Sequence, residues 1–161
     1  MIKEFVGKVK KGEVSVVDHT EKALKEIKRL DKKNNFFNTL SEELALEQAK
    51  NLEGKAKIGN YRGRLFGVPV SVKDDICVKG IETTAGSAIL KGYKPTFNAT
   101  AVEKIISEGG IIVGKTSQDE FGFGSFNVNV GSGLKIPKNP LDKERSCGGS
   151  SGGSAGITAA A

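Results

Sequence analysis

Apolar residues recur every three or four positions over the first thirty residues, which is the spacing of an amphipathic helix. This pattern predicts one helix over residues 2–9 and a second over 17–30, with lysines on their polar faces. Ser15 precedes the second helix and has Asp18 three positions after it, as in a capping box with Asp in place of Glu. We therefore expect the chain to begin with two helices.

A polar segment over residues 34–38 follows these helices and predicts a turn. Its two adjacent phenylalanines are expected in the core rather than as stacking platforms for bases, because no basic cluster surrounds them. Thr39 and Glu42 form a second capping box before a helix whose apolar side runs along 44–52. Residues 53–64 are polar, basic and glycine-containing, which predicts a loop.

From residue 65 the pattern changes to continuous apolar runs. Two of these runs, 65–72 and 111–113, are rich in β-branched residues and predict buried strands, with Pro69 near the start or at an edge of the first. A helix is predicted between them over 98–108, and a packed, glycine-rich and aromatic loop over 121–133. The alternation of helices and strands predicts an α/β sheet.

Residues 109–116 match the letters of the phosphate-binding P-loop, G-x-x-x-x-G-K-[ST]. That loop follows a strand and opens a helix, so that its backbone amides point at phosphates. Here a predicted helix comes first, and the variable positions are mostly β-branched and apolar. We therefore expect these variable positions to form a strand rather than a phosphate loop, with nucleotide binding near Lys115 as the alternative.

Composition narrows the class of protein. The 161 residues are 37% apolar and 27% charged, which is typical of one soluble globular domain. The net charge of +6 permits a nucleic-acid partner, but the lysines are spread rather than clustered, which favours an ordinary solvated surface. Two distant cysteines and one histidine predict neither a disulfide framework nor a metal site. With no signal peptide or membrane-spanning run, we expect a cytoplasmic location and no membrane partner.

The run Ser146–Ser154 contains four glycines and four serines. Such a run is either a flexible linker or a loop that approaches a small ligand and exposes a hydroxyl. The alanine-rich segment 154–161 follows at once and predicts a buried helix, which favours the loop. Because this helix reaches Ala161 without a cap or stop signal, the chain is expected to be the N-terminal part of a longer protein.

Lys73 follows the first predicted strand, where open α/β sheets place their chemistry. A serine needs a base to remove its proton, and His19, the single histidine, falls in a predicted surface helix. A neutral lysine is the other candidate base, so we expect Lys73 beside the hydroxyl of Ser150. The alternative is an ion pair of Lys73 with Asp74 or Asp75. For the lysine to act as a base, at least one of these carboxylates must point away or be engaged elsewhere.

The two segments around Lys73 and Ser150, Gly67–Asp74 (GVPVSVKD) and Gly148–Ala155 (GGSSGGSA), together resemble the amidase signature family. Shorter matches are Lys79-Gly80-Ile81, Thr83-Thr84, Ala99-Thr100, Gly114-Lys115-Thr116, Asp119-Glu120-Phe121, Gly124-Ser125 and Lys138-Asn139-Pro140. Within the family, the chain is most similar to the A subunits of glutamyl-tRNA(Gln)/aspartyl-tRNA(Asn) amidotransferases, over nearly its whole length.

The resemblance implies an incomplete amidase signature fold of the α/β class, with N-terminal helices followed by part of a mixed sheet flanked by helices. On this basis we divide the chain into an N-terminal helical segment, 1–64, and the first part of the amidase core, 65–161.

The resemblance also implies a Ser–Ser–Lys mechanism. Lys73 would be the base, and Ser150 the bridging serine in a rare cis peptide, which costs about 3–4 kcal/mol. The nucleophilic serine would follow in an Asp-x-Gly-Gly-Ser segment beyond Ala161. Further residues would support the substrate loop: Gly124, Ser125, Gly149, Ser151 and Ser154.

On this resemblance, the chain is the N-terminal part of a glutaminase subunit that supplies ammonia for transamidation of Glu-tRNA(Gln) or Asp-tRNA(Asn). Its partners would be the B and C subunits, with charged tRNA bound mainly by the B subunit. ATP and Mg²⁺ would be bound by a partner and no cofactor by this chain, which alone should not hydrolyse glutamine. The alternatives are an amidase of another branch that acts on small or aryl amides, and an inactive truncated chain.

Overall fold

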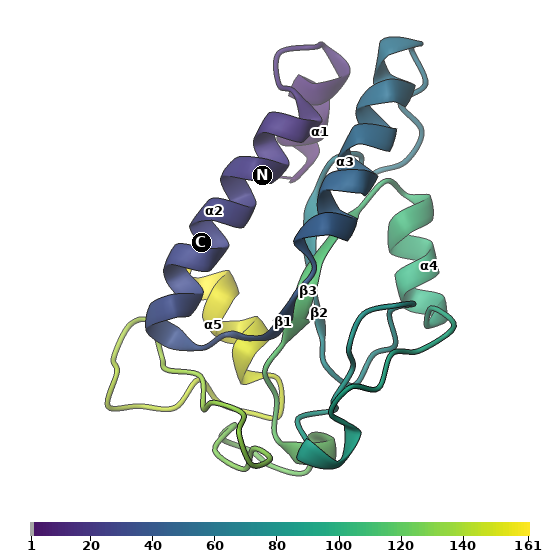
Figure 1. Ribbon diagram of the computed structural model, residues 1–161. Helices are drawn as coiled ribbons and strands as arrows, with labels where there is room; N and C mark the ends of the chain where they lie inside the picture. Colours follow the sequence, from purple (N-terminus) through teal and green to yellow (C-terminus); the bar gives the residue numbers. More distant parts are fainter. Residues whose placement is uncertain (1) are drawn as a thin grey trace.

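The computed structural model describes residues 2–161 and shows a small sheet flanked by helices (Figure 1). The helices are α1 (Ile2–Lys10), α2 (Val16–Asn34), α3 (Glu42–Lys57), α4 (Thr100–Ser107) and α5 (Gly152–Ala160). The strands are β1 (Phe37–Leu40), β2 (Pro69–Lys73) and β3 (Ile111–Thr116), and two 3₁₀ turns are η1 (Ala88–Leu90) and η2 (Glu120–Gly122).

The sheet has the strand order β1-β3-β2, with β3 antiparallel to β1 and parallel to β2. The parallel pair is connected through α4, because parallel neighbours need a crossover. All six residues of β3 are buried, as expected of a central strand covered on both faces. The mixed sheet implied by the amidase resemblance is confirmed, and the P-loop letters end in this strand as their β-branched residues predict.

Two apolar clusters pack on the opposite faces of the sheet. One contains buried residues of α1, α2 and α3 together with Ile111 and Val113. The other contains Val102 of α4 together with Ile112 and Val72. Neighbouring residues of β3 therefore point to opposite sides, which is the alternation of a strand. The first cluster draws on residues from both sides of position 64, and the division at that position remains a prediction.

Several local predictions are wrong. The strand predicted over 65–72 begins only at Pro69 and ends at Lys73. The segment 34–38 is not only a turn, because it leads into β1. This edge strand pairs antiparallel with the central strand β3. Thr39 does not cap α3: the N-cap residue is Ser41, whose hydroxyl donates a hydrogen bond to the carbonyl of Ile112 at 3.0 Å. The loop predicted from residue 53 begins later, since α3 continues to Lys57.

Ser15 caps α2, as its spacing to Asp18 predicts. Its Oγ accepts a hydrogen bond from the backbone N–H of Asp18 at 3.1 Å and donates one to Glu53 Oε1 of α3 at 2.6 Å. The bond to the carboxylate lowers the pKa of Glu53 below its ordinary value, because it stabilises the charged form. The Ser15 hydroxyl therefore caps the N-terminus of α2 and also links this helix to α3.

We expect Ser15→Ala to lower the free energy of unfolding by about 1–2 kcal/mol. The folded-state pKa of Glu53 lies below its ordinary value of 4.5, so this carboxylate stabilises the fold above that pH. Its contribution is lost as the pH falls through the folded-state pKa.

Urea unfolding at about pH 7 and about pH 3 measures the effect, and the difference between wild type and variant should shrink in acid. Ser107→Ala is the control, because this exposed hydroxyl bonds to the carbonyl of Lys104 in its own helix. An equal difference at both pH values would contradict the role given to Glu53.

Candidate active site

Lys73 is the last residue of β2 and meets Ser150 at the carboxyl end of the parallel strands. Its Nζ donates a hydrogen bond to Ser150 Oγ at 2.8 Å, across 77 positions of sequence. Only 18% of the lysine side chain is exposed, and Ser150 is half-buried. The structure therefore brings together the two residues that the sequence predicts as base and bridging serine.

The carboxylate of Asp75 lies beside this pair. Its Oδ2 is 3.7 Å from Lys73 Nζ, and 39% of the Asp75 side chain is exposed. Its backbone N–H donates to Oε1 of the buried Gln118 at 3.1 Å. The ion pair considered as an alternative is thus present, and it involves the more exposed of the two carboxylates.

Asp74 forms a fully buried charge pair with Lys115, at 3.3 Å between Oδ1 and Nζ. The carboxylate also accepts hydrogen bonds from Asn38 Nδ2 at 2.9 Å and from the backbone N–H and hydroxyl of Thr84. Lys115 Nζ donates to the hydroxyl of Thr83 at 2.8 Å. Burial lowers the pKa of Lys115, and the charge of Asp74 opposes this shift. Asp74 is thereby engaged away from Lys73, and Lys115 is engaged inside the protein rather than at a phosphate site.

Asp119 attaches the loop after β3 to Ser150. Its backbone N–H donates to the Ser150 carbonyl at 3.1 Å, and its carboxylate accepts from the backbone N–H groups of Asn127 at 2.9 Å and Asn129 at 3.1 Å. Gly124 lies so close to this carboxylate that a Cβ would overlap it. The sequence did not reveal this role, because the partners of Asp119 are backbone groups that no side-chain pattern marks.

The Gly/Ser run is a tightly packed turn into α5, so the linker interpretation is wrong. The Gly149–Ser150 peptide is cis, as the family resemblance implies. A Cβ on Gly149 would lie 2.7 Å from the backbone N of Asn127, and one on Gly152 would overlap the Asn127 side chain. Side chains larger than hydrogen are therefore excluded at positions 149 and 152, which bracket Ser150 and Ser151.

The other predicted site residues fall into two groups. Ser151 is the N-cap residue of α5, and the Ser154 hydroxyl is 2.7 Å from that of Thr116 at the end of β3. Gly124 and Ser125 are exposed on the loop after η2. The expected nucleophilic serine belongs to a segment outside the described residues.

His19 takes no part in this arrangement. It lies on α2 with its ring centroid 4.2 Å from that of Phe5 on α1, as expected of a helix residue. Burial lowers its pKa.

Across residues 2–161, no group of three or more His, Cys, Asp or Glu side chains could hold a metal ion. Within the same range, no helix is long and apolar enough to span a bilayer.

A family model described as Amidase matches residues 18–161. The chain belongs to the amidase family. This amidase chain is 45% identical over 152 residues to the A subunit of glutamyl-tRNA(Gln) amidotransferase from Thermoanaerobacter pseudethanolicus, a match that covers 94% of the chain and 30% of that protein. It spans about a third of the length of the curated relatives that it matches.

Solved amidase structures share the fold. A bacterial aryl acylamidase of the amidase signature enzymes superposes with a TM-score of 0.92 at 28% identity, covering 98% of this amidase chain and 33% of that protein. The A subunit of glutamyl-tRNA(Gln) amidotransferase from Thermotoga maritima gives 0.70 at 34% identity, covering 88% and 28%. The chain is more similar in sequence to the amidotransferase subunit and more similar in structure to the aryl acylamidase. Both kinds of amidase therefore share the fold of this chain.

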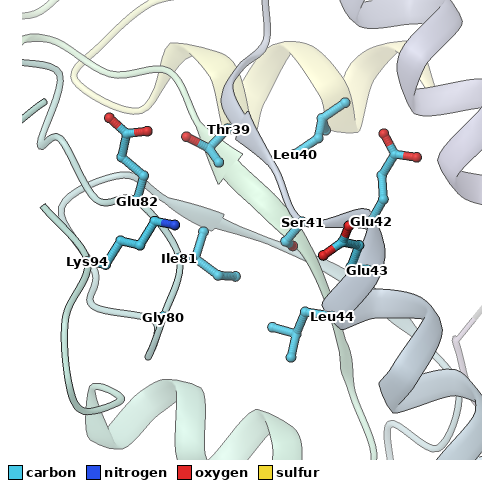
Figure 2. A pocket seen from close by; sticks show the side chains of 10 residues that line it. All are labelled: Thr39, Leu40, Ser41, Glu42, Glu43, Leu44, Gly80, Ile81, Glu82 and Lys94. Carbon is cyan, nitrogen blue, oxygen red and sulfur yellow. The ribbon is translucent and has the colours of Figure 1, made fainter. Parts of the chain in front are cut away.

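A groove of about 550 Å³ lies between the start of α3 and the loop over residues 80–94 of the amidase chain (Figure 2). Figure 2 shows Glu82 and Lys94 on one side and Glu42 and Glu43 on the other. Two of these carboxylates already have partners: Glu42 pairs with a lysine of α2 at 2.6 Å, and Glu82 accepts a backbone N–H at 2.7 Å. The groove includes neither member of the Lys73–Ser150 pair, and we assign it no chemistry.

The predicted packed loop over 121–133 is packed only in part. Its backbone is held by Asp119, but Phe121, Phe123 and Phe126 expose 50%, 81% and 63% of their surfaces. The amidase chain thus carries three exposed aromatic side chains on a loop whose backbone lies beside Gly149 and Ser150.

Gly153→Ala is expected to destabilise the amidase chain by about 1–3 kcal/mol. A Cβ there would lie 2.6 Å from the backbone N and 2.7 Å from the carbonyl O of Ser117, so α5 would have to move away from β3. Gly54→Ala, within α3, is the control: its Cβ meets nothing within 4 Å, and better helix propensity should add up to about 1 kcal/mol. Thermal unfolding followed by circular dichroism measures both, and equal losses would contradict the packing argument.

Proposed function

We propose that this chain is the N-terminal part of an amidase that hydrolyses glutamine through a Ser–Ser–Lys relay. The observation that carries the proposal is the 2.8 Å distance between Lys73 Nζ and Ser150 Oγ at the end of β2. A lysine this close to a hydroxyl can accept its proton when the amine is neutral. The engagement of Asp74 by Lys115 supports this use, because that carboxylate does not compete for Lys73.

In the proposed reaction, a serine from a later segment of the protein attacks the amide carbon of glutamine. Its proton passes to Ser150, and the proton of Ser150 passes to Lys73. The relay then returns a proton to the leaving nitrogen, so that ammonia departs and a glutamyl ester remains on the nucleophile. Water hydrolyses this ester by the same relay to give glutamate.

The loop residues would shape the substrate site. Gly124 and Ser125 lie on the exposed loop that Asp119 holds against Ser150. Gly149, Ser151 and Ser154 would keep the Gly/Ser turn and the start of α5 in place, since their backbone and hydroxyl groups contact neighbouring elements.

The ammonia would serve the transamidation of Glu-tRNA(Gln) or Asp-tRNA(Asn) in a cytoplasmic complex with B and C subunits. The support is 45% identity to a relative named as the A subunit of glutamyl-tRNA(Gln) amidotransferase. Charged tRNA would bind mainly to the B subunit, and ATP with Mg²⁺ to a partner rather than to this chain.

A second candidate is hydrolysis of aryl amides without tRNA. The observations that favour it are the TM-score of 0.92 with an aryl acylamidase and the three exposed phenylalanines on the loop beside Ser150. Aromatic rings at the rim of a site favour an aromatic substrate, because they bury apolar surface against it.

Complementation with a relative tests the two candidates. The chain is co-expressed with the remaining two thirds of the Thermoanaerobacter pseudethanolicus protein, and ammonia release from glutamine and cleavage of para-nitroacetanilide are measured on the co-purified pair. We expect glutamine hydrolysis by the pair and none by the chain alone. Cleavage of the anilide without glutamine hydrolysis would support the second candidate. Glutamine hydrolysis by the chain alone would show that one of its own serines is the nucleophile.

A further inference from the structure

The Lys73–Ser150 pair is assembled entirely from residues of this chain. A hydroxyl beside an amine that can accept its proton is a nucleophile in its own right, as in serine–lysine enzymes. We propose that Ser150 of this chain takes an acyl group directly from activated aryl esters, with Lys73 as the base. This reactivity goes beyond the proposed function, in which Ser150 only transfers a proton, and it does not depend on a later serine.

Ser150 differs from its neighbours in the Gly/Ser run. The Ser154 hydroxyl is bonded to Thr116, whereas the Ser150 hydroxyl has the amine of Lys73 at 2.8 Å. One flank of Ser150 Oγ faces Gly122, where even an added Cβ would be at an ordinary contact distance of 3.9 Å. Ser150 itself is only half-buried, which leaves room for a small acyl group to approach this residue.

The surroundings select the class of acyl donor. Phe121 and Phe123 flank Gly122 in the chain and expose 50% and 81% of their surfaces. Phe126, 63% exposed, belongs to the same loop, and its backbone N would be 2.7 Å from a Cβ on Gly149. The backbone that carries these exposed rings lies beside Ser150, so the rings are available to an aromatic leaving group. An aryl ester of a small acid fits this site better than an ester without a ring.

The acyl transfer balances without another reactant. Lys73 accepts the proton of Ser150, whose oxygen attacks the ester carbonyl. The bond from that carbonyl to the aryl oxygen breaks, the phenolate leaves, and the ammonium of Lys73 releases its proton to water. The carboxylate of Asp75, 3.7 Å from Nζ, attracts the ammonium form and opposes the first step. Removing its charge should therefore speed the reaction.

Labelling with para-nitrophenyl acetate tests the proposal. The purified chain is incubated with the ester, nitrophenolate release is followed, and the acetylated residue is identified by peptide mass spectrometry. We expect one acetyl group on Ser150, none there in Ser150→Ala, and a rate at least about 100-fold lower in Lys73→Met. Asp75→Asn should raise the rate several-fold, a change opposite in sign to that caused by damage to the fold.

Two exposed residues supply the controls. Lys79→Met and Ser132→Ala remove the same groups from the surface and should leave the labelling of Ser150 unchanged. Phe123→Ser should slow labelling by para-nitrophenyl acetate more than labelling by trifluoroethyl acetate, which is activated but has no ring. Circular dichroism confirms that each variant is folded.

Three results would overturn the proposal: no acetyl group on Ser150, acetylation confined to lysines, or unchanged Ser150 labelling in Lys73→Met. None of these results depends on glutamine hydrolysis by the complemented pair. Labelling without glutamine hydrolysis would reject the proposed function alone, and glutamine hydrolysis without labelling would reject this inference alone.

Discussion

Replacing Lys73 by methionine in the complemented amidase should lower kcat for glutamine hydrolysis about 1,000-fold, with little change in KM. Methionine keeps an unbranched side chain but has no atom that can take a proton from Ser150. The lysine contacts Ser150 and Asp75 within the protein, so its loss removes proton transfer rather than substrate contacts. Ammonia release over a range of glutamine concentrations separates the two effects.

Ser150→Ala and the double variant complete this test. If Lys73 and Ser150 act as one relay, the double variant should be no slower than either single variant, because removing one member already stops proton transfer. Lys79→Met, an exposed lysine on the loop after β2, is the matched control and should retain full activity. Independent, multiplying losses in the double variant would contradict a shared relay, as would more than about a tenth of the activity remaining in Lys73→Met.

Replacing Lys115 by methionine should lower the free energy of unfolding by about 3–5 kcal/mol. Lys115 and Asp74 have no exposed side-chain surface, so the variant leaves a carboxylate in the interior without its opposite charge. Hydrogen bonds from Thr84 and Asn38 remain, but they do not neutralise that charge. Urea unfolding of the chain at neutral pH measures the loss.

The double variant Lys115→Met/Asp74→Asn separates charge from packing. Asparagine carries no charge and can still accept some of the hydrogen bonds at this position, so the double variant should be more stable than Lys115→Met alone. Lys104→Met is the control, because it removes an exposed lysine from α4 and should change stability by less than about 0.5 kcal/mol. A double variant less stable than Lys115→Met would show that packing and not charge is decisive.

Part of the structure follows from local patterns. Helical periodicity predicts α1 and α2, and the spacing of Ser15 to Asp18 predicts the start of α2, because these signals involve only residues within a few positions of each other. The apolar run 111–113 predicts a strand in spite of the P-loop letters around it, since β-branched residues favour extended backbone. Other features depend on distant partners. The pattern around the short strand β1 predicts only a polar turn, because its four half-buried residues pair with a strand more than seventy positions away.

The α/β class, the family resemblance and the choice of Lys73 and Ser150 all follow from the amino-acid sequence alone. Tertiary contacts were needed to establish that these two residues meet, that Asp74 turns to Lys115 while Asp75 stays near Lys73, and that the phenylalanines of the 121–133 loop are exposed. For Asp74 and Lys115, the cause is strand register. A shift between Val70 and Ser71 places Val72 opposite Lys115 in the parallel pair, and a slip of one residue would send each side chain to the other face. Residue types indicate what a side chain can do, but the pairing of β2 with β3 decides which neighbour it contacts.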